Sequence, residues 1–275
     1  MKPLLKWAGG KRHIAHTLER HLPEDWSNGT YFEPFLGGAA LFLHLKPGSA
    51  VLADLNPWLV RFYQDVRDAP QGLLDGIQAL ADSFDSVPTE SKKDFYLDAR
   101  AKFNDSQPSI HSSALFFALN KLCFNGLYRE NSKGKFNVPF GQKLKFPSVI
   151  SEDFLSASGL LAETSLTVAD FVETVEMASE GDFVYFDPPY IPVSATSSFT
   201  SYSSEGFGLD AQRRLASTML NLKERGVRAL TSNSFTDLTA EIYGAMRQEV
   251  VLAPRMVSAR SSGRGEVKEL LITNY

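Results

Sequence analysis

An apolar run that ends at two prolines constrains the fold of this chain more than any other stretch. Residues 183–190 read Phe-Val-Tyr-Phe-Asp-Pro-Pro-Tyr, and the first four predict a buried strand. Because proline fixes its own φ and forces the preceding residue into extended geometry, Asp187 and Pro188 should both be extended, with their oxygens pointing the same way. The segment therefore predicts a rigid cluster of hydrogen-bond acceptors at the end of a strand.

An aromatic ring stands directly beside these acceptors. Tyr190 offers a face on which a flat ligand can stack while it donates hydrogen bonds to the Asp187 carboxylate and to a backbone carbonyl. An exocyclic amine on a nucleobase meets both requirements. The alternative is a strand that merely ends in a Pro-Pro turn, and only the rest of the chain can separate the two interpretations.

A glycine turn followed by an acid indicates a nucleotide-binding unit near the start of the chain. Residues 31–42 read as a short apolar strand, a turn with Gly37 and Gly38, and an apolar helix; a second strand, 50–53, ends in Asp54. Dinucleotide-binding units place an acid about twenty residues after the glycine turn, where it binds ribose hydroxyls. The order predicts a ligand-binding βαβ unit, although a βαβ unit without a ligand would share it.

A polar loop at residues 6–11 precedes a helical pattern formed by Ile14, Leu18 and Leu22. The loop does not match a phosphate-binding loop, because Arg12 stands where Ser or Thr would be needed. The nearby histidines, His13, His16 and His21, have no cysteine or carboxylate partner at ligand spacing, so we expect surface histidines and no metal.

From residue 57 to about 147 the alternation of strands and helices stops. Helical stretches at 58–66, 72–81, 92–102 and 112–122 precede a segment, 123–141, whose aromatic residues flank the turn signals Asn125-Gly126 and Lys133-Gly134. This pattern predicts a hairpin with basic and polar tips, on a second, mostly helical domain. Residues 121–147 hold one acid, Glu130, against six basic residues: Lys121, Arg129, Lys133, Lys135, Lys143 and Lys145. Since the whole chain carries a net charge of −4, a polyanion should meet this local basic face.

The remaining sequence returns to an α/β pattern. We expect strands at 165–168, 227–231, 249–252 and 270–273, a helix at 210–224, and a lid in the Ser- and Thr-rich loop 191–207. The last two strands bracket Arg255, Arg260 and Arg264. A single cysteine, Cys123, excludes an internal disulfide, and no apolar run has the length of a signal peptide core or a membrane span, so we expect a cytoplasmic protein.

Together these motifs resemble the Dam-type DNA adenine-N6 methyltransferases. The resemblance covers essentially the whole chain and keeps the family's order of cofactor half, target-recognition insertion and catalytic strand; it also includes the ending at residues 269–275. It implies an α/β fold: a Rossmann-like, S-adenosylmethionine-dependent sheet with an inserted, mostly helical target-recognition domain that carries a β-hairpin. The implied domains are catalytic, residues 1–56 and 148–275, and target-recognition, residues 57–147.

The resemblance also implies roles for individual residues. S-adenosylmethionine would be the cofactor and S-adenosylhomocysteine the product, with no metal. The catalytic set is Asp187, Pro188, Pro189 and Tyr190. The cofactor-binding set is Trp7, Ala8, Gly9, Lys11, Glu33, Phe35, Gly37, Gly38, Asp54, Leu55, Asp170, Phe171 and Asp187. The DNA-binding set is Lys6, Asn125, Arg129, Asn131, Lys133, Lys135, Gln142 and Lys143.

Two positions depart from the family pattern. Ala39 stands where the last glycine of the family's turn is usual, and Gln142 stands where members that recognise GATC carry an arginine. Arginine reads guanine by a bidentate pair, whereas glutamine prefers adenine, so the resemblance does not carry GATC specificity over to this chain.

The implied function is transfer of a methyl group to the N6 amine of a flipped-out adenine in double-stranded DNA. Three alternatives stay open at this point: cytosine-N4 methylation, methylation of RNA, and a non-catalytic DNA-binding relative. The implied setting is a monomer bound to the nucleoid through DNA, with or without a companion restriction endonuclease.

Overall fold

The computed structural model describes residues 1–191, 207–254 and 266–275. Most of the expected lid and all of Arg255, Arg260 and Arg264 lie outside these residues. The chain divides into two compact units. The first comprises residues 1–10, 37–46 and 56–168, and the second comprises residues 11–36, 47–55 and 169–275.

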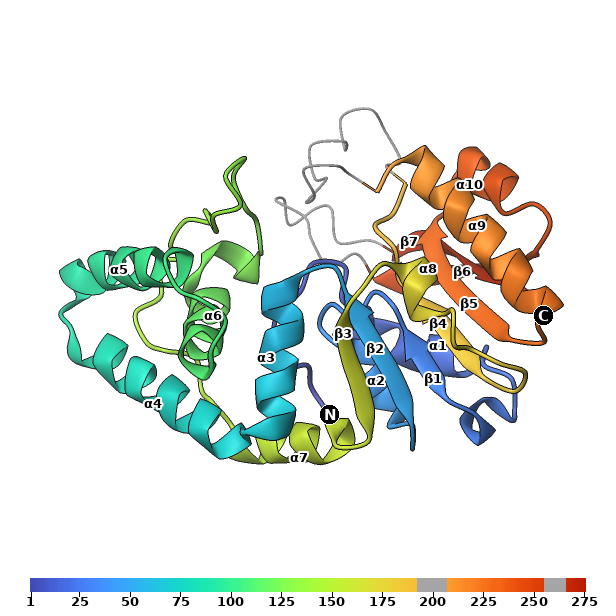
Figure 1. Cartoon of the computed structure of the whole chain (residues 1–275). Helices are drawn as coiled ribbons and strands as arrows, with labels where there is room; N and C mark the ends of the chain where they lie inside the picture. The colour runs from blue at the N-terminus through green and yellow to red at the C-terminus, as the bar shows by residue number, and fades with distance from the viewer. Residues whose placement is uncertain (192–206, 255–265) are drawn as a thin grey trace. The chain divides into compact units, whose positions relative to one another are not determined.

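The second unit is built on a sheet, labelled in Figure 1. Its strands, among the described residues, are β1 (Tyr31–Glu33), β2 (Ala50–Asp54), β4 (Phe183–Phe186), β5 (Arg228–Ser234), β6 (Arg247–Pro254) and β7 (Glu266–Thr273). They lie in the order β2-β1-β4-β5-β7-β6. The first four are parallel, and β7 runs antiparallel to both β5 and β6.

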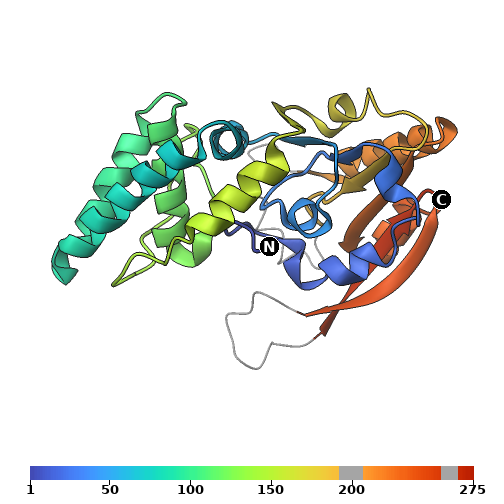
Figure 2. The ribbon, with the colours of Figure 1, turned by 90° about the horizontal axis from the view of Figure 1, so that it is seen from below.

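Helices cover both faces of this sheet. The helices are α1 (Ala15–Glu19), α8 (Phe171–Thr174), α9 (Leu209–Glu224) and α10 (Asp237–Ile242), and Figure 2 shows α1 and α9 on opposite faces. Leu215, Met219 and Leu222 of α9 pack in one buried cluster with Val184 and Phe186 of β4. Each such side chain stabilises the fold by about 1.5–3 kcal/mol when it leaves water. This packing holds β4 rigid up to the residue before Asp187.

The first unit is mostly helical. Its elements are α2 (Ala40–Leu45), α3 (Pro57–Asp68), α4 (Pro70–Ser86), α5 (Lys92–Asn104), α6 (Ile110–Leu122), α7 (Ser151–Leu161) and strand β3 (Thr164–Val168). Helix α6 is buried almost all round, because α3, α4 and α5 all contact it. A capping box at Ser109 begins α6, and the Asn56 side chain with Pro57 at the first helical position begins α3.

The four helices expected between residues 58 and 122 are confirmed as α3 to α6, and each expected strand has a counterpart in the structure. Helices α7, α8 and α10 were not anticipated. No helix among the described residues combines the length and the apolar character needed to span a membrane.

The expected hairpin at 123–141 requires a correction. The segment folds back on itself, but only two isolated antiparallel bridges form, Cys123 with Phe140 and Glu130 with Phe136, and no strand ladder. Asn125 takes a left-handed backbone conformation inside a short 3₁₀ turn, Phe124–Gly126, and Pro139 has no N–H to donate. The segment is therefore an irregular loop, which we call the basic loop (residues 123–143).

Candidate active site at the end of strand β4

Acidic residues lie at the carboxyl ends of three neighbouring parallel strands. Glu33 ends β1, Asp54 ends β2, and Asp187 follows β4 directly. Since β2, β1 and β4 are adjacent in the sheet, these three ends lie along one edge. Open α/β sheets bind ligands at that edge.

The side chain of Lys11 contacts both Asp187 and Tyr190. The Lys11 ammonium lies 2.8 Å from an Asp187 carboxylate oxygen and 4.4 Å from the centroid of the Tyr190 ring. Lys11 is 5 % exposed and belongs to a 3₁₀ turn, Lys11–His13. A buried ammonium of this kind is stable only beside a negative charge, so Lys11 and Asp187 form one unit.

Burial raises the pKa of Asp187 above its ordinary value. The attraction and hydrogen bond of Lys11 oppose this rise, and the negative charge of Glu269 adds to it. Lys11 therefore favours the ionised form of Asp187, whereas burial favours the neutral form. Pro188 is buried next to it, while Pro189 is exposed.

Glu269 of β7 is a site residue that the sequence did not reveal. Its carboxylate accepts a hydrogen bond from the Tyr190 hydroxyl at 2.7 Å, and it is 8 % exposed. Burial, followed by the charges of Asp187 and Glu269, raises the pKa of Tyr190 well above its ordinary value, so the hydroxyl stays a donor. The sequence offered one signal for Glu269, an acidic residue directly before an apolar run of the strand. Gln212, Asn233 and Ser234, which hold the backbone around Tyr190, were missed as well.

Aromatic rings surround the ends of β1 and β4 in this unit. Phe35 stacks on Phe171 with centroids 5.6 Å apart, and Phe186 and Phe207 contact the same pair. Phe35 is only partly buried, so the wall offers an apolar surface to a flat ligand.

Asp170 lies beside this wall and has two structural tasks. Its carboxylate caps α8 by accepting from the Val172 N–H at 3.0 Å, and it pairs with Arg214 at 2.5 Å. Arg214 also lies over the Phe171 ring.

Two other predicted cofactor residues of this unit differ in exposure. Glu33 is buried, and its carboxylate accepts from the Tyr31 hydroxyl at 2.8 Å, whereas Leu55 is 66 % exposed.

The remaining predicted cofactor residues belong to the first unit. Trp7 lies against Gly37, where an added Cβ would come within 2.9 Å of the indole ring. Gly37 also has a φ of 48°, a conformation that favours glycine. Ala8 and Gly9 are exposed and Gly38 is buried. The Trp7 ring thus leaves no room for a side chain at the first glycine of the turn, Gly37, and both residues belong to the first unit.

All predicted DNA-binding residues lie in the first unit. Lys6 is exposed, and both its N–H and its carbonyl bond the side chain of Asn120. Gln142 is exposed and has a φ of 53°, and Asn125 has a φ of 56°. Left-handed non-glycine residues are uncommon and cluster at functional positions.

The basic loop holds its own tip in shape. Asn131 accepts from the backbone N–H groups of Lys133 and Lys135, so its side chain forms the turn that was expected to touch DNA. Arg129 donates to the Asn137 side chain at 2.7 Å, and Lys135 pairs with Asp105 at 2.9 Å. Arg129, Lys133 and Lys135 are all exposed, and Lys143 is partly buried.

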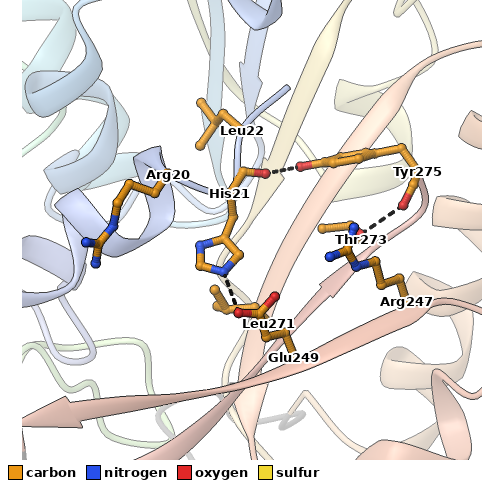
Figure 3. Close-up of a pocket in the computed structure, with 8 residues that line it drawn as sticks. All are labelled: Arg20, His21, Leu22, Arg247, Glu249, Leu271, Thr273 and Tyr275. Carbon is orange, nitrogen blue, oxygen red and sulfur yellow. Dashed lines mark hydrogen bonds and ion pairs between the residues drawn. The ribbon is translucent and has the colours of Figure 1, made fainter. Parts of the chain in front are cut away.

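A pocket of about 340 Å³ lies elsewhere in the second unit (Figure 3). It is lined by Arg20, His21, Leu22, Arg247, Glu249, Leu271, Thr273 and Tyr275. Arg247 pairs with Thr273, which pairs with Leu230 near the start of β5, so the pocket lies at the opposite edge of the sheet from Asp187. Its side chains partner one another: His21 lies 3.2 Å from Glu249, and the Tyr275 hydroxyl donates to the His21 carbonyl at 2.6 Å.

The histidines near the N-terminus need one correction. His16 lies 3.5 Å from the Glu19 carboxylate, and His21 lies near Glu249, so the expectation that no carboxylate accompanies them is wrong. His16 is 86 % exposed at its side chain, as expected of a surface histidine.

A mainly parallel sheet with one antiparallel strand next to its edge is the architecture of a Rossmann-like methyltransferase fold. The comparison with known families gives the particular family. The family model described as D12 class N6 adenine-specific DNA methyltransferase matches residues 7–254. The chain belongs to this family.

Curated relatives match over their full length. A type II methyltransferase, M1.LlaDCHI of Lactococcus lactis subsp. cremoris, is 38 % identical over 282 residues, which cover 100 % of this chain and 96 % of that protein. The DNA adenine methylase of Vibrio cholerae is 38 % identical over 98 % of this chain and 95 % of its own length. The DNA adenine methylase of Escherichia coli K12 is 35 % identical over 98 % and 94 %.

Proposed function

We propose that this chain methylates adenine N6 in double-stranded DNA through the acceptors at Asp187 and Pro188. The observation that carries the proposal is the cluster at the end of β4: the Asp187 carboxylate paired with Lys11, a carbonyl-bearing proline, and the Tyr190 ring beside them. A base flipped out of the duplex would stack on Tyr190 and donate its two amine hydrogens to the Asp187 carboxylate and the Pro188 carbonyl.

These acceptors address the chemical difficulty of the reaction. The adenine N6 lone pair is delocalised into the ring and is a poor nucleophile. Two acceptors that fix the amine hydrogens localise the lone pair, and the Asp187 charge stabilises the positive charge that develops on N6. After the transfer, the extra proton on N6 passes to the solvent by way of the Asp187 carboxylate that accepts its hydrogen bond. The rigid backbone of two prolines contributes by positioning, since the oxygens need no reorganisation.

The carboxyl edge of the second unit suits S-adenosylmethionine as the methyl donor. Asp54 ends β2, where a carboxylate can bind ribose hydroxyls, and Phe35 with Phe171 offers an apolar wall for a flat ring. When bound, S-adenosylmethionine supplies an electrophilic methyl group on a sulfonium. Trp7, Ala8, Gly9, Gly37 and Gly38 of the first unit stay predicted contacts, and no metal is required by this scheme.

We assign DNA recognition to residues 57–147 and the catalytic domain to residues 1–56 and 148–275. The basic loop supports this assignment, because it gathers exposed cationic side chains on a chain that is acidic overall. Arg129 and Gln142 are the candidates for reading bases, and Gln142 favours a site other than GATC. A companion endonuclease, a monomeric state and a nucleoid-associated cytoplasmic location remain predictions.

The test is product analysis. Purified protein is incubated with duplex DNA and isotope-labelled S-adenosylmethionine, and the DNA is digested to nucleosides for mass spectrometry. We expect label in N6-methyldeoxyadenosine and none when Asp187→Ala replaces the wild type. Sequencing of the modified DNA then gives the recognition site. Label in N4-methyldeoxycytidine, or equal label from a folded Asp187→Ala protein, would overturn the proposal.

A further inference from the structure

Three buried side chains hold the backbone on both sides of Tyr190. Gln212 of α9 donates from its amide nitrogen to the Pro189 carbonyl at 2.9 Å. Asn233 near the end of β5 accepts from the Ile191 N–H at 3.1 Å, and the Ser234 hydroxyl donates to the Ile191 carbonyl at 2.6 Å. Both peptide groups that flank Tyr190 are therefore fixed by hydrogen bonds.

The surrounding network decides which way the Gln212 amide faces. The Asn233 side-chain oxygen accepts from the N–H groups of Ile191 and Ser234, so its nitrogen is the group that donates to the Gln212 oxygen at 3.0 Å. The Tyr243 hydroxyl donates to the same oxygen at 2.8 Å. With two donors on its oxygen, Gln212 can present only its N–H₂ group to Pro189.

This network of polar side chains lies in an apolar environment, where burial of polar groups costs free energy. Its presence therefore indicates that the hydrogen bonds serve a purpose. Gln212, Asn233 and Tyr243 are fully buried, and α9 contributes Leu215 and Met219 to the core one and two turns further on. A buried polar group is favourable only when all its hydrogen bonds are made. A site that required only packing could be filled by leucine, whereas a site that must hold a backbone carbonyl in one direction requires an amide.

We infer that Gln212 is a positioning residue for methyl transfer. Through the Pro189 carbonyl it fixes the peptide plane that carries Tyr190, and Asn233 and Tyr243 fix the Gln212 amide in turn. The inference rests on the proposed function, in which Tyr190 stacks on the target base. It predicts that a change at Gln212 misplaces the ring without touching DNA or cofactor.

The experiment is a double-mutant cycle between Gln212→Met and Tyr190→Ala. Methionine keeps the length and volume of glutamine but has no amide. We expect Gln212→Met to lower kcat on the order of 10- to 100-fold, because small misplacements of a reacting group cost that much. Binding of S-adenosylmethionine, measured by calorimetry, should be unchanged. On a Tyr190→Ala background the same change should lower kcat less than twofold, since no ring is left to position.

Two further variants keep the inference falsifiable. Gln248→Met is the matched control, because Gln248 also donates from its amide to a backbone carbonyl, that of Ala240, away from Tyr190; its kcat should match the wild type. If Gln212→Met fails to fold, Tyr243→Phe decides, since it removes one hydroxyl and should lower kcat several-fold. An unchanged kcat in the deciding variant, or losses that simply add on the Tyr190→Ala background, would overturn the inference. Failure of the wild type to methylate adenine would instead refute the proposed function.

Discussion

Lys11 serves two partners at once, the Asp187 carboxylate and the Tyr190 ring. Its position influences the charge of Asp187, the residue proposed to accept a hydrogen bond from the base. If the ammonium is removed, the largest influence that lowers the pKa of Asp187 is lost, and only the hydrogen bond with Ser232 still opposes burial and the charge of Glu269. Both raise the pKa of Asp187, so the carboxylate would be neutralised at a higher pH.

The first prediction concerns the pH dependence of Lys11→Met. A raised pKa means that activity, which requires the ionised form, is lost earlier as pH falls. We therefore expect the acid limb of the kcat profile to move to higher pH than in the wild type. Lys92→Met is a control, because Lys92 is equally buried over Phe84 in the first unit; its acid limb should stay in place. A limb that moves to lower pH in Lys11→Met would contradict the electrostatic role.

The second prediction concerns Ala39, which has a φ of 54° at the start of α2. A left-handed conformation strains any residue with a Cβ, and glycine removes the strain at some cost in unfolded-state entropy. We expect Ala39→Gly to raise the free energy of unfolding by about 0.5–1 kcal/mol, measured by urea denaturation. Ala101→Gly, at an exposed interior position of α5, should lower it by about 1 kcal/mol. Destabilisation by Ala39→Gly would show that the strain is compensated by packing.

The basic loop shows how an irregular element can still be well positioned. Asn104 of α5 bonds both the N–H and the carbonyl of Phe136, and the Tyr96 hydroxyl donates to the Val138 carbonyl. Helix α5 thus holds the base of the loop, while the tip keeps its cationic side chains in solvent. This arrangement suits contacts with a polyanion, because a ligand can bind the exposed tip of the loop without disturbing the core.

The third prediction separates the two kinds of DNA contact on this loop. Arg129→Ala should cost about 1–3 kcal/mol on the recognition site and relax discrimination at one base pair. Lys135→Ala should weaken binding to specific and random duplexes alike, with a salt slope reduced by about one. Affinity is measured against salt concentration on matched and single-substituted duplexes. If Arg129→Ala weakens every duplex equally, Arg129 contacts phosphate rather than a base.

The elements differ in how far local sequence determines them. Helices α3 to α6 could be predicted because their apolar spacing and caps are local, and the extended tip after β4 could be predicted because proline restricts its own neighbours. The basic loop could not, since its Phe136 and Tyr128 pack on Phe103 of α5 and Phe116 of α6 as well as on each other, and these helix contacts are distant in sequence. Gln212 and Glu269 could not either, because their partners lie 23 and 79 residues away.

At the scale of the whole molecule, charged residues are distributed unevenly between the units. The chain is acidic overall, with a net charge of −4, yet the first unit carries the basic loop and the second carries the acids at the ends of β1, β2 and β4. A ligand that binds only the folded protein stabilises it in proportion to its affinity. Thermal unfolding can therefore report on the proposed cofactor site without any turnover.

The fourth prediction is a thermal shift that depends on Asp54. S-adenosylmethionine at 100 times its Kd should stabilise the wild type by about 2.7 kcal/mol. Asp54→Ala should weaken binding by about 1–3 kcal/mol, because hydrogen bonds to a charged group are lost, so the stabilisation at the same concentration should fall by about a third to nearly all of its wild-type value. Asp98→Ala, on an exposed face of α5, is the control and should keep the full shift. An unchanged shift in Asp54→Ala would remove Asp54 from the cofactor site.

The order of the strands has a consequence during synthesis of the chain. Strand β1 is bonded to β2 on one side and to β4 on the other, and the Thr30 N–H bonds Asp182, 152 residues further along. At about 5–20 residues per second, a ribosome needs roughly 8–30 s to make the intervening chain. Through that interval β1 has an open edge, and the helices of the first unit are completed before it closes. Until β4 is synthesised, the unpaired edge of β1 can therefore bind strands of other nascent chains on the same polysome.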